Sequence, residues 1–242
     1  MGLLILICAV ALLVQLERSP RWPRLDPWRK RWRPWERRIA DYVRSAPFTY
    51  VFLFVLLITT WVYNTSRPSV ARTLLLERST NLHQLGHDPI RVLVASAFWL
   101  SSSWELFVWL VLFSLVLAPV ERWIGSARTS LVFAAGHAGA TLLTAAGLWL
   151  AIRYEVVGAY VEHATDVGVS YGFFAVAAVL IWRLSGRLQA FCAAILIGYL
   201  GVAASVFHGF TDFGHLAAFA IGLSLAPLVT RGRARAGVSA ES

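Results

Sequence analysis

The chain is dominated by long apolar segments that alternate with short, mostly basic connections. Seven such segments lie at 3–16, 48–63, 92–118, 129–152, 167–182, 188–207 and 213–229. Most of them approach the ~20 residues that a helix needs to cross a bilayer. Within the hydrocarbon every backbone polar group must be paired inside the protein, which favours helices. The pattern therefore predicts an all-α, polytopic membrane helix bundle.

The basic connections predict how these helices are oriented. Every second connection between the apolar segments, and the tail that follows the last of them, is rich in arginine: 17–44, 121–128, 183–187 and 231–235. The connection at 154–166, by contrast, is richer in acid. Because short basic loops stay in the cytoplasm, we expect a six-helix core from Phe48 onward with both of its ends cytoplasmic. This describes a multi-pass protein of the cell membrane. Lys30 is the one lysine among the basic residues, which favours a GC-rich, bacterial genome.

These features divide the chain into four parts. Residues 1–16 form an N-terminal apolar segment, predicted as an extra span because it lacks the basic start of a signal peptide; docking at the interface is the alternative. Residues 17–45 form an Arg- and Trp-rich cytoplasmic linker, 46–230 the transmembrane core and 231–242 a basic cytoplasmic tail. The linker carries Trp22, Trp28, Trp32 and Trp35 between arginines. This composition suits the headgroup region beside anionic lipid, and a solvated linker is the alternative.

Several other classes of partner are disfavoured. The formal net charge of +9 resides in loops between membrane segments, so the lipid bilayer is expected as a partner and nucleic acid is not. Cys8 and Cys192 both lie in apolar runs and indicate no disulfide framework or thiolate metal site. His83 and His87, with Asp88 beside them, are read as surface residues. No metal and no cofactor are expected.

One serine and one histidine stand out inside the last apolar segments. Ser170 lies in Gly168-Val169-Ser170-Tyr171-Gly172, and His215 lies near the start of 213–229. Polar residues in membrane segments are costly and often mark a functional site. In the predicted orientation both segments run inward from the outside, so the two side chains share a depth. A histidine beside a serine can take its proton and activate it as a nucleophile; ordinary helix packing is the alternative.

Helical spacing predicts that these two segments pack against each other. One face carries Ser170, Phe174, Ala177 and Ala178, and the other carries His215, Ala218 and Gly222. Small residues at such spacing let membrane helices approach closely. We expect the Phe174 ring to pack against the imidazole.

Four short motifs resemble those of the rhomboid intramembrane serine proteases over roughly 48–229. They are Ser96-Ala97-Phe98 at the opening of a helix, Glu121-Arg122-Trp123-Ile124-Gly125 after the second core helix, Gly168-Val169-Ser170 in the fourth, and His215 with Gly222 in the sixth. The resemblance implies a rhomboid-like six-helix core. It also implies that Ser170 is the nucleophile and His215 the general base, cleaving a transmembrane protein substrate near the outer face.

The motifs also depart from the family pattern. Tyr171 stands where GxSG has its last glycine, and Ala218 stands at the first glycine of HxxGxxxG. Glu105 and Trp109 stand where active members carry HxxxN, whose side chains help to hold the oxyanion. Each such donor is typically worth ~3 kcal/mol, so their loss does not by itself abolish activity.

Substitute donors are available to the predicted site. The Trp109 indole N–H, a protonated Glu105 and the backbone N–H of Ser170 are candidates, and His137 is either a further site residue or a helix-packing residue. Two functions stay open: an intramembrane serine endopeptidase, and a rhomboid-like pseudoprotease that binds transmembrane clients without cutting them. A transporter is disfavoured because the sequence has no inverted repeat.

Overall fold

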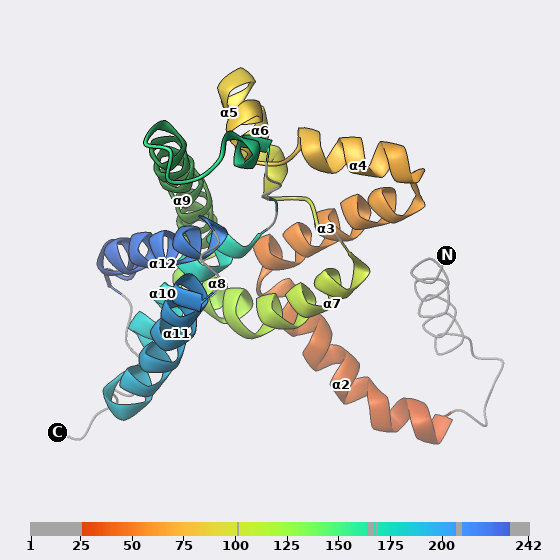
Figure 1. Ribbon diagram of the computed structural model, residues 1–242. Coiled ribbons are helices and arrows are strands. Elements are labelled where there is room, and N and C mark those ends of the chain that lie inside the picture. Colours follow the sequence, from red (N-terminus) through yellow and green to blue (C-terminus); the bar gives the residue numbers. More distant parts are fainter. Residues whose placement is uncertain (1–25, 101, 164–166, 168, 207–209, 233–242) are drawn as a thin grey trace. The chain divides into compact units, whose positions relative to one another are not determined.

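The computed structural model describes residues 26–100, 102–163, 167, 169–206 and 210–232 (Figure 1). This part of the chain consists of helices and connections, with no strand in it. The predicted N-terminal span, Gly168 and most of the basic tail lie outside the described residues. The chain divides into two compact units, Met1–Pro47 and Phe48–Ser242.

The described part of the first unit contains α2 (Asp26–Arg44), so the segment predicted as a linker is helical over most of its length. α3 begins at the end of that unit and continues into the second. The elements from there on are α3 (Pro47–Thr65), α4 (Pro68–Glu77), α5 (Leu82–His87), α6 (Pro89–Ser96), α7 (Ser103–Leu112), the π-helix η2 (Phe113–Leu117), α8 (Ala118–Ile124), α9 (Ser126–Arg153), the 3₁₀ helix η3 (Ala159–His163), α10 (Ser170–Arg183), α11 (Gly186–Val206) and α12 (Phe210–Val229).

Four helices in the described residues are long and apolar enough to cross a membrane: Pro47–Thr65, Ser103–Ile124, Ser126–Arg153 and Phe210–Val229. α10 and the described part of α11, Gly186–Val202, are shorter apolar helices. α10 is the central one, because the whole stretch from Tyr171 to Val179 is buried. The prediction of an all-α polytopic membrane bundle is confirmed.

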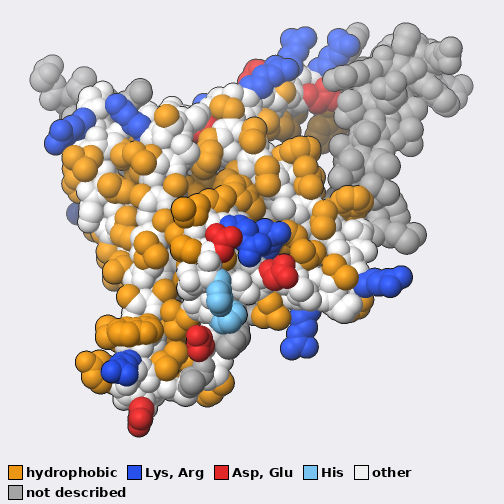
Figure 2. All heavy atoms as spheres, turned by 90° about the horizontal axis from the view of Figure 1, so that it is seen from above, with side chains coloured by type: hydrophobic (Ala, Val, Ile, Leu, Met, Phe, Trp, Pro, Cys, Tyr) orange, Lys and Arg blue, Asp and Glu red, His pale blue; other side chains and the backbone are white. Residues whose placement is uncertain are grey.

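The outward faces of these helices are apolar. Phe54 is 60%, Leu115 66% and Leu131 59% exposed, and each lies on a helix long enough to span a membrane. In Figure 2, hydrophobic side chains cover much of the described surface and charged side chains gather at fewer places. A surface of this kind suits lipid rather than water as its solvent.

The second core segment differs from the prediction. A helix was expected from Val92 and through Ser96-Ala97-Phe98, whereas α6 ends at Ser96 and the spanning helix begins only at Ser103. The Ser102 hydroxyl caps this later start, because it accepts a hydrogen bond from the Glu105 backbone N–H at 3.2 Å. Ser-x-x-Glu is a common sequence at a helix N-terminus. The apolar run continues across the break, so hydrophobicity alone did not reveal it.

The same spanning helix widens in its middle. The π-helical turn η2 lies directly before Pro119, which occupies the first turn of α8. Proline has no N–H to give and its ring crowds the preceding turn of an α-helix, and a π turn relieves this by accommodating one extra residue. The helix then ends at Gly125, whose φ of 92° is in the region that favours glycine.

The buried carboxylate of Glu121 joins three helices. Its side chain accepts hydrogen bonds from the backbone N–H groups of Phe48 at 2.7 Å and Thr49 at 2.8 Å, in the first turn of α3. It also accepts from the Thr49 hydroxyl at 2.7 Å and from the Ser126 hydroxyl, at the start of α9, at 2.6 Å. The first N–H groups of a helix lack intrahelical partners and carry partial positive charge. Glu121 of α8 therefore satisfies the start of α3 and ties it to the turn between α8 and α9.

We expect Glu121→Gln to lower the free energy of unfolding by about 3 kcal/mol, because the amide turns a donor toward buried donors and leaves them unpaired. Thermal unfolding of the detergent-solubilised protein measures the effect. Glu77→Gln, at an exposed position on α4, is the matched control. Equal melting temperatures for the two variants would show that the Glu121 carboxylate does not hold the bundle.

Candidate functional site

α10 packs against both α9 and α12, and Figure 1 shows these three helices together. Their close contact is possible because glycines at the contact points have no side chain. A Cβ at Gly222 of α12 would overlap the Ala175 backbone carbonyl, and one at Gly136 of α9 would overlap the Ala175 side chain. Ala218, one turn before Gly222, is fully buried. Gly222 of the predicted α12 face thus meets α10 at Ala175, which lies outside the face predicted for α10.

Tyr171, which replaces the last glycine of GxSG, is accommodated by a glycine on the facing helix. Its ring is 3% exposed and lies against Gly214, where a Cβ would overlap the ring and its hydroxyl oxygen. Gly172 in turn lies against the Phe133 ring. A Cβ at position 172 would be only 2.5 Å from the nearest atom of that ring. The bulk of Tyr171 therefore fits because the residue before His215 has no side chain.

His215 is held by two aromatic rings of α10. The imidazole centroid lies 4.7 Å from the Phe174 ring and 5.4 Å from the Tyr171 ring, the latter in an edge-to-face arrangement. The contact predicted between Phe174 and the imidazole is present. The Nε2 atom of His215 is buried and has no hydrogen-bond partner.

Ser170 is the first residue of α10 and is partly exposed. It lies one turn before Phe174 and next to Tyr171, so it belongs to the segment that encloses the imidazole. Because Nε2 of His215 has no partner, the Ser170 hydroxyl is not hydrogen-bonded to it in this structure. The serine and the histidine share one helix pair without forming the bond that links a nucleophile to its base.

Asp212 is a neighbour of His215 that the sequence reasoning missed. Its Oδ1 lies 4.0 Å from Nδ1 of His215, and both side chains are largely buried, at 20% and 17% exposed. The spacing of three residues on one helix is the signal that could have revealed it. A carboxylate on the Nδ1 side favours the tautomer that leaves Nε2 free to accept a proton.

His137 serves the packing of α9 against α6. Its Nε2 lies 3.0 Å from the Leu93 carbonyl and 3.1 Å from the Ser96 hydroxyl. Its ring is 6.3 Å from the Tyr171 ring, so it borders the site through an aromatic side chain. Of the two predicted roles, the geometry favours the structural one.

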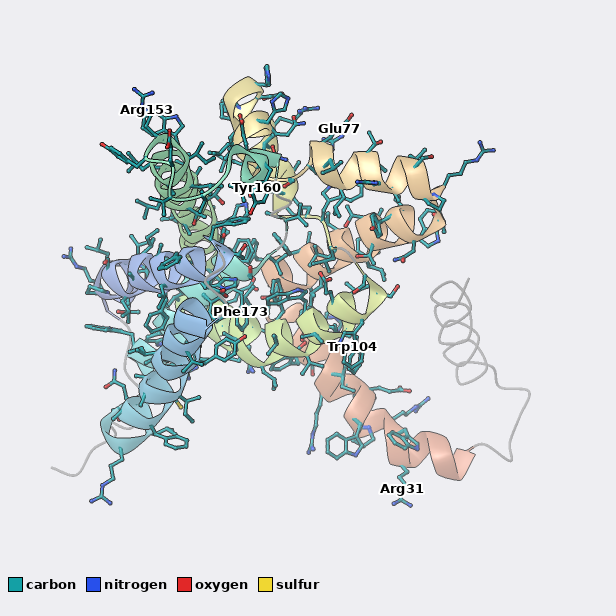
Figure 3. All side chains as sticks on the ribbon, viewed as in Figure 1. Arg31, Glu77, Trp104, Arg153, Tyr160 and Phe173 are labelled. Atoms are coloured by element: carbon teal, nitrogen blue, oxygen red, sulfur yellow. The ribbon has the colours of Figure 1, made fainter. Side chains whose placement is uncertain are left out.

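Glu105 and Trp109 take part in other interactions on α7. Glu105 accepts a hydrogen bond from the Ser102 hydroxyl at 3.3 Å, within the cap described above. The Trp109 ring packs edge to face against Phe113 at 5.8 Å and Phe173 at 5.3 Å. Figure 3 shows Phe173, labelled, beside α7. Trp109 thus contacts α10 at Phe173 and belongs to the aromatic core of the bundle.

An open apolar groove lies beside the histidine helix. It has a volume of about 490 Å³ and runs between the later part of α9 and the start of α12. Its lining includes Leu143, Gly147, Val157, Phe210, Phe213 and Ala217. Phe213 and Ala217 flank His215 in sequence, so the groove and the histidine occupy the same end of α12. Among the described residues no group of three or more His, Cys, Asp or Glu is placed to hold a metal ion.

An all-helical bundle with four described helices long and apolar enough to cross a membrane defines a multi-pass membrane protein. A family model described as "rhomboid-like protein" matches residues 41–236. The chain therefore belongs to the rhomboid-like protein family. No curated protein and no solved structure matches it.

The contact of α10 with α12 can be tested by filling it. We expect Gly222→Ala to lower the free energy of unfolding by about 1–3 kcal/mol, because the new methyl group meets backbone and not a flexible side chain. Gly198→Ala on α11 is the matched control, since nothing lies within 4 Å of its Cβ position. Thermal unfolding in detergent measures both variants. If Gly222→Ala and Gly198→Ala have the same melting temperature, α10 and α12 are not in close contact.

Proposed function

We propose that this protein is a rhomboid-type intramembrane serine protease in which Ser170 is the nucleophile and His215 the general base. The observation that carries the proposal is the packing of Phe174 against the imidazole at 4.7 Å. This contact brings the first two turns of α10 and α12 together. The two side chains that the chemistry needs are in those turns.

The reaction requires Nε2 of His215 to take the Ser170 proton as the hydroxyl oxygen attacks a peptide carbonyl. Nε2 has no competing partner, and Asp212 on the opposite side of the ring favours the proton on Nδ1. Catalytic hydrogen bonds are often long in the free enzyme and tighten when substrate binds. The backbone N–H of Ser170 is the donor that we assign to the oxyanion.

The substrate that we propose is a transmembrane protein cut near the outer face of the cell membrane. The apolar groove between α9 and α12 supports a partner of this kind. It lies beside the helix that carries His215, and its apolar lining suits the apolar side chains of a transmembrane segment. The basic connections of the sequence support an orientation with both ends of the core in the cytoplasm.

A second candidate is a pseudoprotease that binds transmembrane clients without cutting them. Three observations favour it: the missing hydrogen bond between Ser170 and His215, the Tyr171 ring against the imidazole, and the engagement of Trp109 in the aromatic core. Loss of side-chain oxyanion donors lowers the rate of acyl transfer substantially.

A fluorophosphonate probe separates the two candidates, because it reacts only with an activated serine. We expect the detergent-purified protein to be labelled and Ser170→Ala to show no labelling. In His215→Ala the rate should fall by about 10²-fold or more, which is the usual contribution of a general base. Mass spectrometry of the labelled peptide identifies the modified residue.

Absence of labelling, under conditions in which an active rhomboid reacts, would contradict the protease. A transmembrane client that crosslinks equally to wild type and Ser170→Ala, with no cleavage product, would support the pseudoprotease instead.

Asp212 should act as a positioning residue for His215. We expect Asp212→Asn to slow probe labelling about tenfold, equivalent to a small loss of transition-state stabilisation, while Asp212→Glu keeps the carboxylate and retains more of the rate. The melting temperatures of both variants should match that of wild type. Equal labelling rates for wild type and Asp212→Asn would remove Asp212 from the mechanism.

A further inference from the structure

α2 has one aromatic face and a surrounding basic surface. Trp32, Trp35 and Ile39 follow i, i+3, i+7 spacing and therefore share one side of the helix. These three side chains are 47%, 55% and 62% exposed, respectively. Large apolar groups aligned on one face of a helix indicate a surface that binds something apolar.

The rest of the α2 surface is cationic. From Arg31 to Arg44 the helix carries five arginines against two carboxylates, Glu36 and Asp41. Asp41 lies 3.7 Å from Arg44 at an exposed position, so one of the two carboxylates is locally compensated. In Figure 3 the labelled Arg31 extends away from the axis of α2. The helix therefore presents an excess of positive charge to anything that covers its aromatic face.

The arginines and tryptophans also interact with each other. The Arg38 guanidinium lies over the Trp35 ring at 5.3 Å from its centroid. Cation–π contact of this kind holds a charged group at the border of an apolar surface. The arrangement matches the boundary between phosphate groups and acyl chains, where indole rings are enriched and long basic side chains reach outward.

The chain sequence keeps this helix close to a membrane. α2 ends at Arg44 and α3, which is long and apolar enough to span, begins at Pro47. Only Ser45 and Ala46 separate them, and an extended residue covers at most ~3.6 Å. The last turn of α2 therefore cannot leave the vicinity of a membrane span.

We infer that α2 is an interfacial helix that binds a phospholipid surface with anionic headgroups. Trp32, Trp35 and Ile39 enter the boundary between headgroups and acyl chains, and the arginines pair with lipid phosphates. A helix with strong amphipathicity, a basic polar face and tryptophan on its apolar face binds membranes in this manner. The inference concerns the first unit of the chain and is independent of whether Ser170 cuts peptide bonds.

Site-directed spin labelling of the full-length protein in nanodiscs tests the inference. Cys8 and Cys192 are replaced by serine, and a nitroxide is attached through Ile39→Cys on the aromatic face or Arg37→Cys on the polar face. Accessibility to a water-soluble nickel chelate and to oxygen reports the depth of each label. In nanodiscs of phosphatidylglycerol and phosphatidylcholine we expect the label at 39 to be shielded from nickel and open to oxygen, and the label at 37 to be exposed to nickel.

Lipid composition and charge variants identify the ligand. In phosphatidylcholine alone, or after Arg33→Gln and Arg38→Gln in the anionic nanodisc, the label at 39 should become accessible to nickel. The balance should move toward the exposed state about fivefold for each arginine removed. Arg153→Gln, an exposed arginine at the end of α9, should change nothing.

Three outcomes would overturn the inference. Equal nickel accessibility at 37 and 39 in anionic nanodiscs would mean that α2 does not lie in the interface. Equal shielding of 39 in anionic and neutral nanodiscs would mean that headgroup charge is not recognised. Shielding of 39 from both nickel and oxygen would assign the aromatic face to a protein partner, because oxygen dissolves in acyl chains but does not reach a buried protein contact.

Discussion

The arrangement of the bundle depends on the buried carboxylate of Glu121. Glu121 accepts hydrogen bonds from the first turn of α3 and from the first residue of α9, while its own backbone belongs to α8. Glu121 is only 2% exposed, so water does not satisfy the start of α3 at this point. An acceptor placed here is worth more than a surface hydrogen bond, because without it these buried donors would be unpaired. The resemblance of Glu121-Arg122-Trp123-Ile124-Gly125 to a family turn thus has a physical content: the glutamate caps one helix and Gly125 turns the chain into the next.

The helices α9, α10 and α12 pack closely because a larger residue on one helix faces a glycine on another. Ala175 lies between Gly136 and Gly222, and Tyr171 lies against Gly214. Tyr171 replaces a small residue of the family motif, yet the close approach of α10 and α12 is kept, because space is provided on the facing helix. The imidazole of His215 is consequently enclosed by two rings, and its environment is more apolar than a glycine at 171 would leave it.

Much of this arrangement could be predicted from the sequence, and the failures have physical causes. Apolar length predicted the helices that span, and helical spacing predicted the contact of Phe174 with His215. The break between α6 and α7 was missed because hydrophobicity continues through it, although Ser102 and Glu105 formed a readable cap. Asp212 was overlooked although its spacing of three residues from His215 was visible in the sequence. The role of Glu121 was not visible, because its partners Phe48 and Thr49 lie more than 70 residues away in the chain.

The π turn at Phe113–Leu117 changes how positions on the second core helix should be compared with those of other proteins. One extra residue in a turn rotates everything beyond it by about 100° relative to a regular α-helix. If positions are matched by counting residues back from Glu121 to Trp109, the matched side chains point in different directions from those of a regular helix. Positions before and after η2 must therefore be aligned separately. The direction of Trp109 toward α10 follows from where the helix begins, at the Ser102 cap.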